Sequence, residues 1–351
     1  MLKGLALTPP AIGRISIGKV IERNGKRLPE KDDEFTITSQ VQGKEGWITH
    51  PLDAALRQSQ QKAPATTSGA AAGPESTARD SKLRTIPVRL MFNDPDLNLR
   101  SSYCLFDRQS GRPICVGNGE TCKRASISGI QSLDCPSPEA CGFNAHGYCK
   151  PYGRMNVLIV VEPENSVEPS AASKPPASDH DELGSFVFRT TGFNSIRTLA
   201  SRLSYFSAAS GGLLSCLPLE LRLRGKSTSQ SHRAPIYYVD LTVRTGFNLN
   251  QAISRAREVS LERQGAGLDQ EALDSAARQG FALGAFEESA EEGVAVVEEF
   301  FPEQASDAGS GQTDAIPSGG PGKVAKRSKP PALADKIASK AALLQPVETG
   351  P

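Results

Sequence analysis

The chain has 351 residues, of which 38% are hydrophobic, and it contains 32 glycines and 25 prolines. This length suggests about two domains, but the low apolar share means that part of the chain cannot bury a core. The formal charge of +1, from 40 basic and 39 acidic residues, excludes no class of partner by itself. No apolar run approaches the roughly 20 residues of a membrane-spanning helix, and the first ten residues lack a secretion signal. We therefore expect a soluble protein that stays in the cytoplasm, with no membrane partner.

Charge is distributed unevenly along the chain. Residues 181–258 contain ten lysines and arginines against five acidic residues, whereas residues 259–305 contain two against eleven. A basic folded part followed by an acidic arm suits a protein that meets a polyanion such as DNA. Ordinary solvated faces and a solubilising arm explain the same pattern, so charge alone does not identify the partner.

Three stretches rich in Ser, Ala, Pro and Gly divide the chain, and such tracts bury too little apolar area to order themselves. The expected organisation is an N-terminal segment (1–57), a flexible linker (58–81), an α+β core (82–303) and a disordered tail (304–351). Within the core we expect a cysteine-rich module (104–153), a flexible insertion (162–182) and an acidic helical arm (259–303).

Hydrophobic periodicity predicts the elements of the core. Alternating or buried apolar runs predict six strands, at 84–92, 102–107, 154–161, 184–190, 217–224 and 235–244. The tetrapeptide Asn93–Asp96 has turn chemistry and predicts a turn after the first strand.

Helical periodicity begins at Asn194, where apolar residues recur every three or four positions. It predicts one long helix with Asn194 or Ser195 as its N-cap, and two further helices at 248–263 and 268–280. The predicted fold class is therefore α+β. We expect a mixed or antiparallel sheet with one long helix, an inserted cysteine-rich metal-binding module, and disordered loops and C-terminal tail.

Six of the seven cysteines lie between residues 104 and 149, among turn formers and with almost no aliphatic residues from 134 to 153. A segment with so little core needs a covalent or coordinate link to be ordered. Disulfides do not fit a chain without a secretion signal, whereas four thiolates fit structural Zn²⁺. An iron–sulfur cluster and cysteines without metal are the alternatives, because the usual spacing of two to four residues between paired zinc ligands is absent.

The predicted metal ligands are four cysteines of the turn-rich segment, with a fifth in reserve: Cys122, Cys135, Cys141 and Cys149, and Cys115. Cys104 lies in a strand pattern and Cys216 in an apolar run, which favours core positions for both. His146 lies between two of the candidates and could replace one of them.

The sequence favours a protein that is not an enzyme. An all-thiolate site is closed and activates water poorly, and the common hydrolase and phosphate-binding motifs are absent from the sequence. A metal-dependent hydrolase, the alternative, needs carboxylate ligands such as Asp94, Asp96 or Asp107. A second alternative is a protein–protein adaptor whose acidic arm, 287–303, docks on a basic partner.

Four blocks of sequence, taken in order, resemble one family: CKPYGR at 149–154, FRTTGFNSI at 188–196, LPLEL at 217–221 and IYYVDL at 236–241. They resemble the phage recombination directionality factor-like proteins. The chain is still more similar to proteins of bacterial integrative and conjugative elements that are labelled "hydrolase or metal-binding protein". The segments 5–19 and 26–33 also resemble this second group, so that the resemblance covers roughly 1–57 and 83–303.

The resemblance implies a factor that binds a serine integrase on DNA and biases it toward excision, and it implies the same four metal-binding cysteines. We therefore expect a non-enzymatic, zinc-stabilised accessory protein of a mobile genetic element, either a phage or an integrative element, that modulates DNA recombination. A site-specific recombinase and DNA are the expected partners. The candidates for a DNA-facing surface are basic residues of the core, for which a solvated sheet face is the simpler alternative: Arg189, Arg197, Arg202, Arg222, Arg224, Lys226 and Arg233.

Overall fold

The computed structural model describes residues 10–23, 26–43, 46–62, 82–107, 109–144, 147–161, 184–227, 229, 233–282 and 290–300. Most of the predicted linker, the predicted insertion at 162–182 and the predicted disordered tail lie outside these residues. So does His146.

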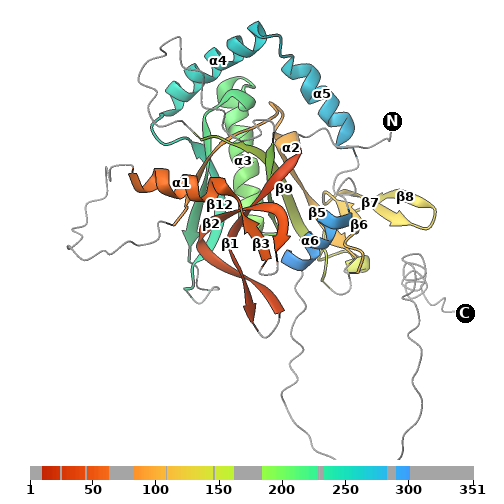
Figure 1. The fold of residues 1–351 in the computed structure, drawn as a ribbon. Helices are drawn as coiled ribbons and strands as arrows, with labels where there is room; N and C mark the ends of the chain where they lie inside the picture. Colours follow the sequence, from red (N-terminus) through yellow and green to blue (C-terminus); the bar gives the residue numbers. More distant parts are fainter. Residues whose placement is uncertain are drawn as a thin grey trace, which may run out of the picture.

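The fold is α+β and is built on a mixed, mostly antiparallel sheet of twelve described strands (Figure 1). Its main path runs β3 (Gly46–Thr49), β2 (Lys26–Gly43), β1 (Ala11–Arg23), β10 (Ser185–Thr190), β9 (Lys150–Ile159), β5 (Leu99–Phe106), β6 (Pro113–Gly117), β7 (Thr121–Ser126) and β8 (Gly129–Asp134). A branch joins β9 to β4 (Thr85–Arg89), β4 to β11 (Leu219–Lys226), and β11 to β12 (Ile236–Val243). Among the described strands, β1 and β10 form the parallel pair.

The six predicted strands are confirmed as β4, β5, β9, β10, β11 and β12, with bounds that differ by a few residues. The N-terminal segment joins the same sheet, since β1 pairs with both β2 and β10. The helix α1 (Pro51–Lys62) extends into the first residues of the predicted linker. Its Arg57 donates to Asp53, one turn earlier, and to Glu34 of β2, which attaches the helix to the sheet.

The first long helix of the core, α3 (Phe193–Ser210), starts earlier than predicted, and its N-cap is Gly192. The prediction of Asn194 or Ser195 as N-cap is wrong because both side chains bind the sheet. Asn194 accepts a hydrogen bond from Lys226 of β11, and Ser195 accepts one from the backbone N–H of Val239 in β12. These bonds hold the start of α3 against the β11–β12 hairpin.

Four further helices complete the described elements after the N-terminal part. The predicted helices 248–263 and 268–280 are confirmed as α4 (Leu249–Gly265) and α5 (Gln270–Gly280). Because α4 has 17 residues and α3 has 18, the core does not have a single long helix. The predicted turn at Asn93–Asp96 is the start of a one-turn helix, α2 (Pro95–Asn98), whose N-cap Asp94 accepts from the N–H of Asp96. The last described helix is α6 (Ala290–Phe300).

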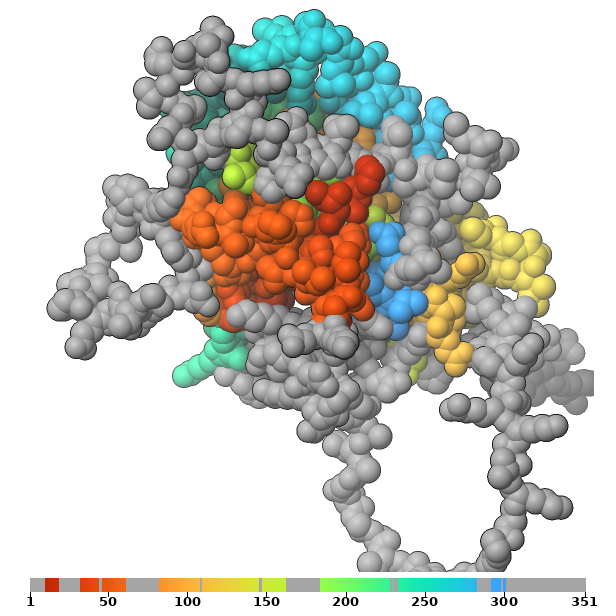
Figure 2. Space-filling model, in the orientation of Figure 1, coloured from red at the N-terminus to blue at the C-terminus, as the bar shows by residue number. Residues whose placement is uncertain are grey.

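The main hydrophobic core lies between the sheet and α3, with α1 and α4 at its margins (Figure 1). It includes the fully buried side chains of Phe35, Ile86, Leu199, Leu203 and Leu241. A smaller cluster joins β5 and β9 to α6, which lies between the N-terminal strands and β5–β6 (Figure 2).

Candidate metal centre

Two of the cysteines lie on one face of the β6–β7 pair. Cys115 lies opposite Arg124, and Gly117 opposite Cys122, so these four residues share a face of the antiparallel pair. A Cβ atom on Gly117 would lie 2.7 Å from the sulfur of Cys135 and 2.8 Å from the Cβ of Cys122. The absence of a side chain at Gly117 therefore allows the thiols to approach each other.

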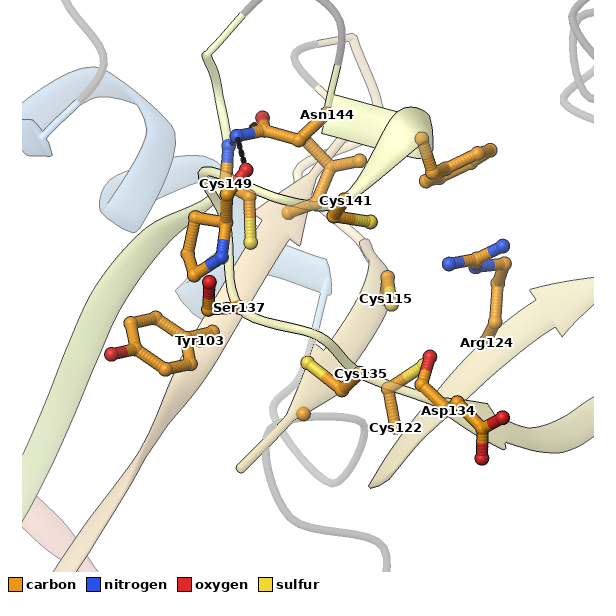
Figure 3. Close-up of a pocket in the computed structure, with 14 residues that line it drawn as sticks. Tyr103, Cys115, Cys122, Arg124, Asp134, Cys135, Ser137, Cys141, Asn144 and Cys149 are labelled. Atoms are coloured by element: carbon orange, nitrogen blue, oxygen red, sulfur yellow. Dashed lines mark hydrogen bonds between the residues drawn. The ribbon is translucent and has the colours of Figure 1, made fainter. Parts of the chain in front are cut away.

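The irregular segment between β8 and β9 covers this face and carries the other three thiols. Asn144 organises the segment, because its side-chain oxygen accepts the N–H of Cys149 at 2.8 Å and its side-chain nitrogen donates to the carbonyl of Pro138 at 2.9 Å. The backbone N–H of Asn144 also donates to the carbonyl of Cys141. These bonds place Cys141 and Cys149 beside each other, facing the β6–β7 pair (Figure 3).

Five thiols therefore line one small pocket of about 20 Å³, those of Cys115, Cys122, Cys135, Cys141 and Cys149 (Figure 3). This volume holds about one water-sized particle. As the side chains lie, no three His, Cys, Asp or Glu residues of the described chain are arranged to hold a metal ion. The structure thus brings the predicted ligands and the reserve ligand to one pocket, while the zinc site itself stays a prediction.

Burial favours the protonated form of two thiols of the pocket, those of Cys122 and Cys149. Burial, together with a hydrogen bond with Cys115, raises the pKa of Cys122 to about 11. Burial also raises the pKa of Cys149 to about 12, with Cys115 as its strongest thiol neighbour. Cys115 therefore interacts with both residues and is a stronger ligand candidate than its sequence spacing indicated.

Arg124 is a cation that lines this pocket, and it was not among the residues predicted from the sequence. Burial alone would lower its pKa, but the neighbouring Cys115 raises it, with smaller contributions from Cys122 and Cys141. Its guanidinium lies 4.1 Å from the ring centre of Phe143, and its buried Nε has no hydrogen-bond partner among the described residues. The sequence did contain a signal for Arg124. It lies two residues after Cys122 on a strand, and side chains at that spacing point to the same face as the thiols.

The remaining two cysteines lie outside the pocket. Cys104 is fully buried beside Phe106 and Tyr152, and Cys216 is buried next to Ser215. Both are core residues, as the sequence predicted.

The carboxylates that a hydrolase would need do not reach the thiols. Asp94 caps α2 and accepts from Arg278, and Asp107 accepts from Ser110 in its own turn. Neither of them, nor Asp96, lines the pocket, where the structure places Asp134 instead.

Six of the seven candidate DNA-facing residues lie around α3 and the β11–β12 hairpin, and we call this surface the α3–β11 face. It consists of Arg197, Arg202, Arg222, Arg224, Lys226 and Arg233. On β11, Arg222, Arg224 and Lys226 share one strand face, as the sequence indicated. The side chains of Arg202, Arg222 and Arg224 are 37–42% exposed, and Arg197 and Arg233 are exposed.

Several cations of the α3–β11 face are paired within the fold. Arg202 and Arg224 both bind the buried carboxylate of Asp240, and Arg222 binds that of Glu220. Arg189 does not belong to this face, because its side chain is only 3% exposed and pairs with Glu292 of α6.

The described residues thus form an α+β protein whose mixed sheet carries a thiol pocket at one side and a cationic face at the other. Residues 12–244 match the family model described as Gp3-like, "Recombination directionality factor-like". The chain belongs to this family, which confirms the resemblance carried by the four sequence blocks. Neither a curated protein nor a solved structure matches the chain. None of the helices in the described part of the chain has the length and apolar character needed to span a bilayer.

Proposed function

We propose that this protein is a non-enzymatic, zinc-stabilised accessory factor that acts with a site-specific recombinase on DNA and directs recombination toward excision. The observation that carries the proposal is the family match, which extends over residues 12–244, well over half of the chain. That family connects the chain with phage recombination, recombinases and DNA.

The zinc part of the proposal rests on the chemistry of the pocket. Thiolates are the ligands of structural zinc sites, and five thiols surround a space of about 20 Å³. Cys135, Cys141 and Cys149 would supply three ligands, and Cys115 or Cys122 the fourth. The bound metal would join the β6–β7 pair to the segment that covers it, and Arg124 would offset the negative charge of the thiolates.

Serine variants test this assignment one ligand at a time. Cys141→Ser should lose the metal, because three thiolates do not close a tetrahedral site, and metal content is read by mass spectrometry of the purified protein. Of Cys115→Ser and Cys122→Ser, one should lose the metal and the other should retain it. Cys216→Ser, outside the pocket, is the control that keeps it. Full zinc content in Cys141→Ser contradicts the ligand set, and a brown protein with visible absorbance identifies an iron–sulfur cluster instead.

The absence of enzymatic activity is supported by the size and lining of the thiol pocket. A volume of about 20 Å³ leaves no room for an organic substrate beside the sulfurs. Of the acidic groups predicted for a hydrolase, Asp94 is engaged in the cap of α2 and Asp107 in the turn after β5, and Asp96 does not line the pocket. Metal-dependent turnover of an ester or phosphoester would overturn this part of the proposal.

The α3–β11 face is the proposed DNA-facing surface. Its paired arginines keep more than a third of each side chain exposed, so a guanidinium can bind an internal carboxylate and a phosphate together. Such contacts position a protein on DNA without reading its sequence. Binding should therefore weaken steeply with salt, with a log–log slope near −0.9 for each phosphate contact.

A triple variant, Arg197→Gln with Lys226→Gln and Arg233→Gln, tests this surface without removing the partner of a buried carboxylate. In a gel-shift assay, the triple variant should bind DNA more weakly than the wild type, and by the same factor for every DNA sequence. The assay is run with and without the recombinase of the mobile element. Arg255→Gln is the control, because Arg255 is 48% exposed on α4, away from this face. DNA binding by the triple variant equal to that of the wild type, in both arms of the assay, would contradict the placement.

A further inference from the structure

The helix α6 covers three arginines of the sheet with two of its glutamates. Glu292 accepts hydrogen bonds from Arg189 at 2.9 Å and from Arg154 at 3.2 Å. About two turns further along, on the same side of the helix, Glu299 accepts from Arg14 at 2.5 Å. In the space-filling view α6 (blue) lies in contact with the N-terminal strands, which carry Arg14 (Figure 2).

The three arginines form one cationic cluster on adjacent strands. Arg14 lies on β1, Arg189 on β10 and Arg154 on β9, and the register places Arg189 directly opposite Arg154. Their side chains are 6%, 3% and 10% exposed, respectively. With α6 in place these charges are buried, and buried charges of one sign are costly unless an anion lies against them; Glu292 and Glu299 supply the anions.

Beside the arginines lies an apolar surface that α6 also contacts. Val296 and Val297 pack against Cys104, Phe106 and Tyr152 of β5 and β9. We use the name α6 seat for the surface formed by Arg14, Arg154, Arg189, Cys104, Phe106 and Tyr152. Its charged part and its apolar part together match an amphipathic helix whose one side carries both glutamate and valine.

Two glycines allow the backbone of α6 to approach the sheet. A Cβ atom on Gly111, in the turn between β5 and β6, would collide with the backbone of Gly293 and Val294. A Cβ atom on Gly293 would collide in turn with the carbonyl of Gly111. The contact is therefore specific for a helix that offers a small residue at this point.

The internal stability of α6 is low. It has only 11 residues, and Gly293 and three valines lower its helix propensity, so it is not stable as an isolated helix. The ion pair of Arg14 with Glu299 adds little net energy, because burial opposes both charges: it lowers the pKa of Arg14 and raises that of Glu299. The helical form of α6 therefore depends on its contact with the seat and not on its own helix propensity.

We propose that the α6 seat is a binding site for an acidic amphipathic helix of a partner protein, and that α6 is the chain's own occupant, which the partner helix replaces. The seated α6 displays the chemistry of the ligand: glutamates at the arginines, branched aliphatic residues at Phe106 and Tyr152, and a glycine at Gly111. DNA phosphates could pair with the guanidinium groups but would leave the apolar part of the seat without a contact. The proposal stands independently of the recombination function and of the zinc site.

A peptide with the sequence of residues 290–300, carrying a fluorophore, tests the proposal on the full-length chain by fluorescence polarisation. Wild-type protein should bind it weakly, because the attached α6 competes at an effective concentration in the millimolar range. The variant Gly293→Val excludes its own α6 from Gly111 and leaves the seat intact, so it should bind the peptide at least tenfold more tightly. A peptide with Glu292→Gln and Glu299→Gln should bind this variant at least tenfold more weakly than the native peptide.

The thermal midpoint of Gly293→Val distinguishes a replaceable helix from a structural one. A decrease of only a few degrees is expected, and a collapse of the fold would overturn the proposal by making α6 a fixed part of it. No peptide binding by a folded Gly293→Val chain would also overturn it. Displacement of the peptide by duplex DNA would assign the seat to nucleic acid. A wild-type dimer that Gly293→Val converts to a monomer would assign it to α6 of a second copy.

Discussion

Asp240 is a buried carboxylate shared by two arginines. Its oxygens accept from Arg202 at 3.0 Å and from Arg224 at 2.7 Å, and its side chain is 3% exposed. Burial alone would raise its pKa, but the hydrogen bonds from both arginines hold the pKa of Asp240 below its ordinary value. This single group connects α3 with β11 and β12.

Asp240→Asn should lower the free energy of unfolding by about 1–3 kcal/mol at pH 7, because the arginines lose their charged partner while staying half exposed. Since the folded pKa is depressed, the stabilisation is complete above the ordinary pKa of an aspartate and is lost as the pH falls through the folded value. The difference between wild type and variant in urea denaturation should therefore shrink below about pH 4. Asp96→Asn, at an exposed position, should show no such difference at any pH.

Gly117 sets how closely the thiols of β7 and of the covering segment approach. Gly117→Ala should push Cys135 away, since the added carbon would lie 2.7 Å from its sulfur, and metal affinity should fall by at least tenfold. Competition with a chromogenic chelator measures the affinity. Gly142→Ala is the matched control in the same module, because nothing lies within 4 Å of its added carbon. Equal affinities for the two variants would contradict the close approach at Gly117.

At the scale of elements, the segment between β8 and β9 depends on Asn144 rather than on a core. Asn144→Ala removes the bonds to Cys149 and Pro138 and should raise hydrogen exchange across residues 135–149 and chymotrypsin cleavage after Phe143 or Tyr148. Asn144→Asp keeps the acceptor for the N–H of Cys149 and loses the donor to Pro138, so it should give an intermediate result. Unchanged protection in Asn144→Ala would show that other contacts order this segment.

Contact with the main core decides which strands could be predicted from the sequence. The strands β4, β9 and β11 alternate or are continuously apolar because they border the main core, and that pattern is visible in one sequence. The strand β8 is exposed along its whole length and has no apolar face to indicate it. Its partner β7 is placed by the turn at Asn118, whose side chain accepts from the N–H groups of Glu120 and Thr121.

The candidate site was predictable in its cysteines but not in its supporting residues. Clustering in a segment without core indicated the thiols, whereas the central position of Cys115 follows from the β6–β7 register. Arg124 and Asn144 act through the pairing of strands and the course of a loop, which local sequence does not specify. Likewise, nothing in its own sequence indicated that Arg189 is buried, since Glu292 lies 103 positions away.

For the whole molecule, the main hydrophobic core contains none of the five pocket cysteines, so the thiol module and the core should lose their structure separately. Removing the metal with a chelator and a thiol-reversible reagent should abolish hydrogen-exchange protection in residues 113–149. Protection in β10, α3 and β11 should persist, because their contacts are apolar. Loss of protection throughout the chain on metal removal would contradict this independence.

The parallel pairing of β1 with β10 has a consequence for how the chain is made. Ala11 lies beside Ser185 and Ile15 beside Phe188, so one edge of β1 has no partner until 174 further positions have been translated. At roughly 5–20 residues per second, that edge waits on the order of 10–35 seconds on the ribosome. An unpaired edge that carries apolar residues is a template for aggregation, and fragments that stop before β10 should bind chaperones or precipitate. This edge can be paired only once β10 has been made, about halfway along the chain, which makes the nascent chain, rather than the finished protein, the form most exposed to misfolding.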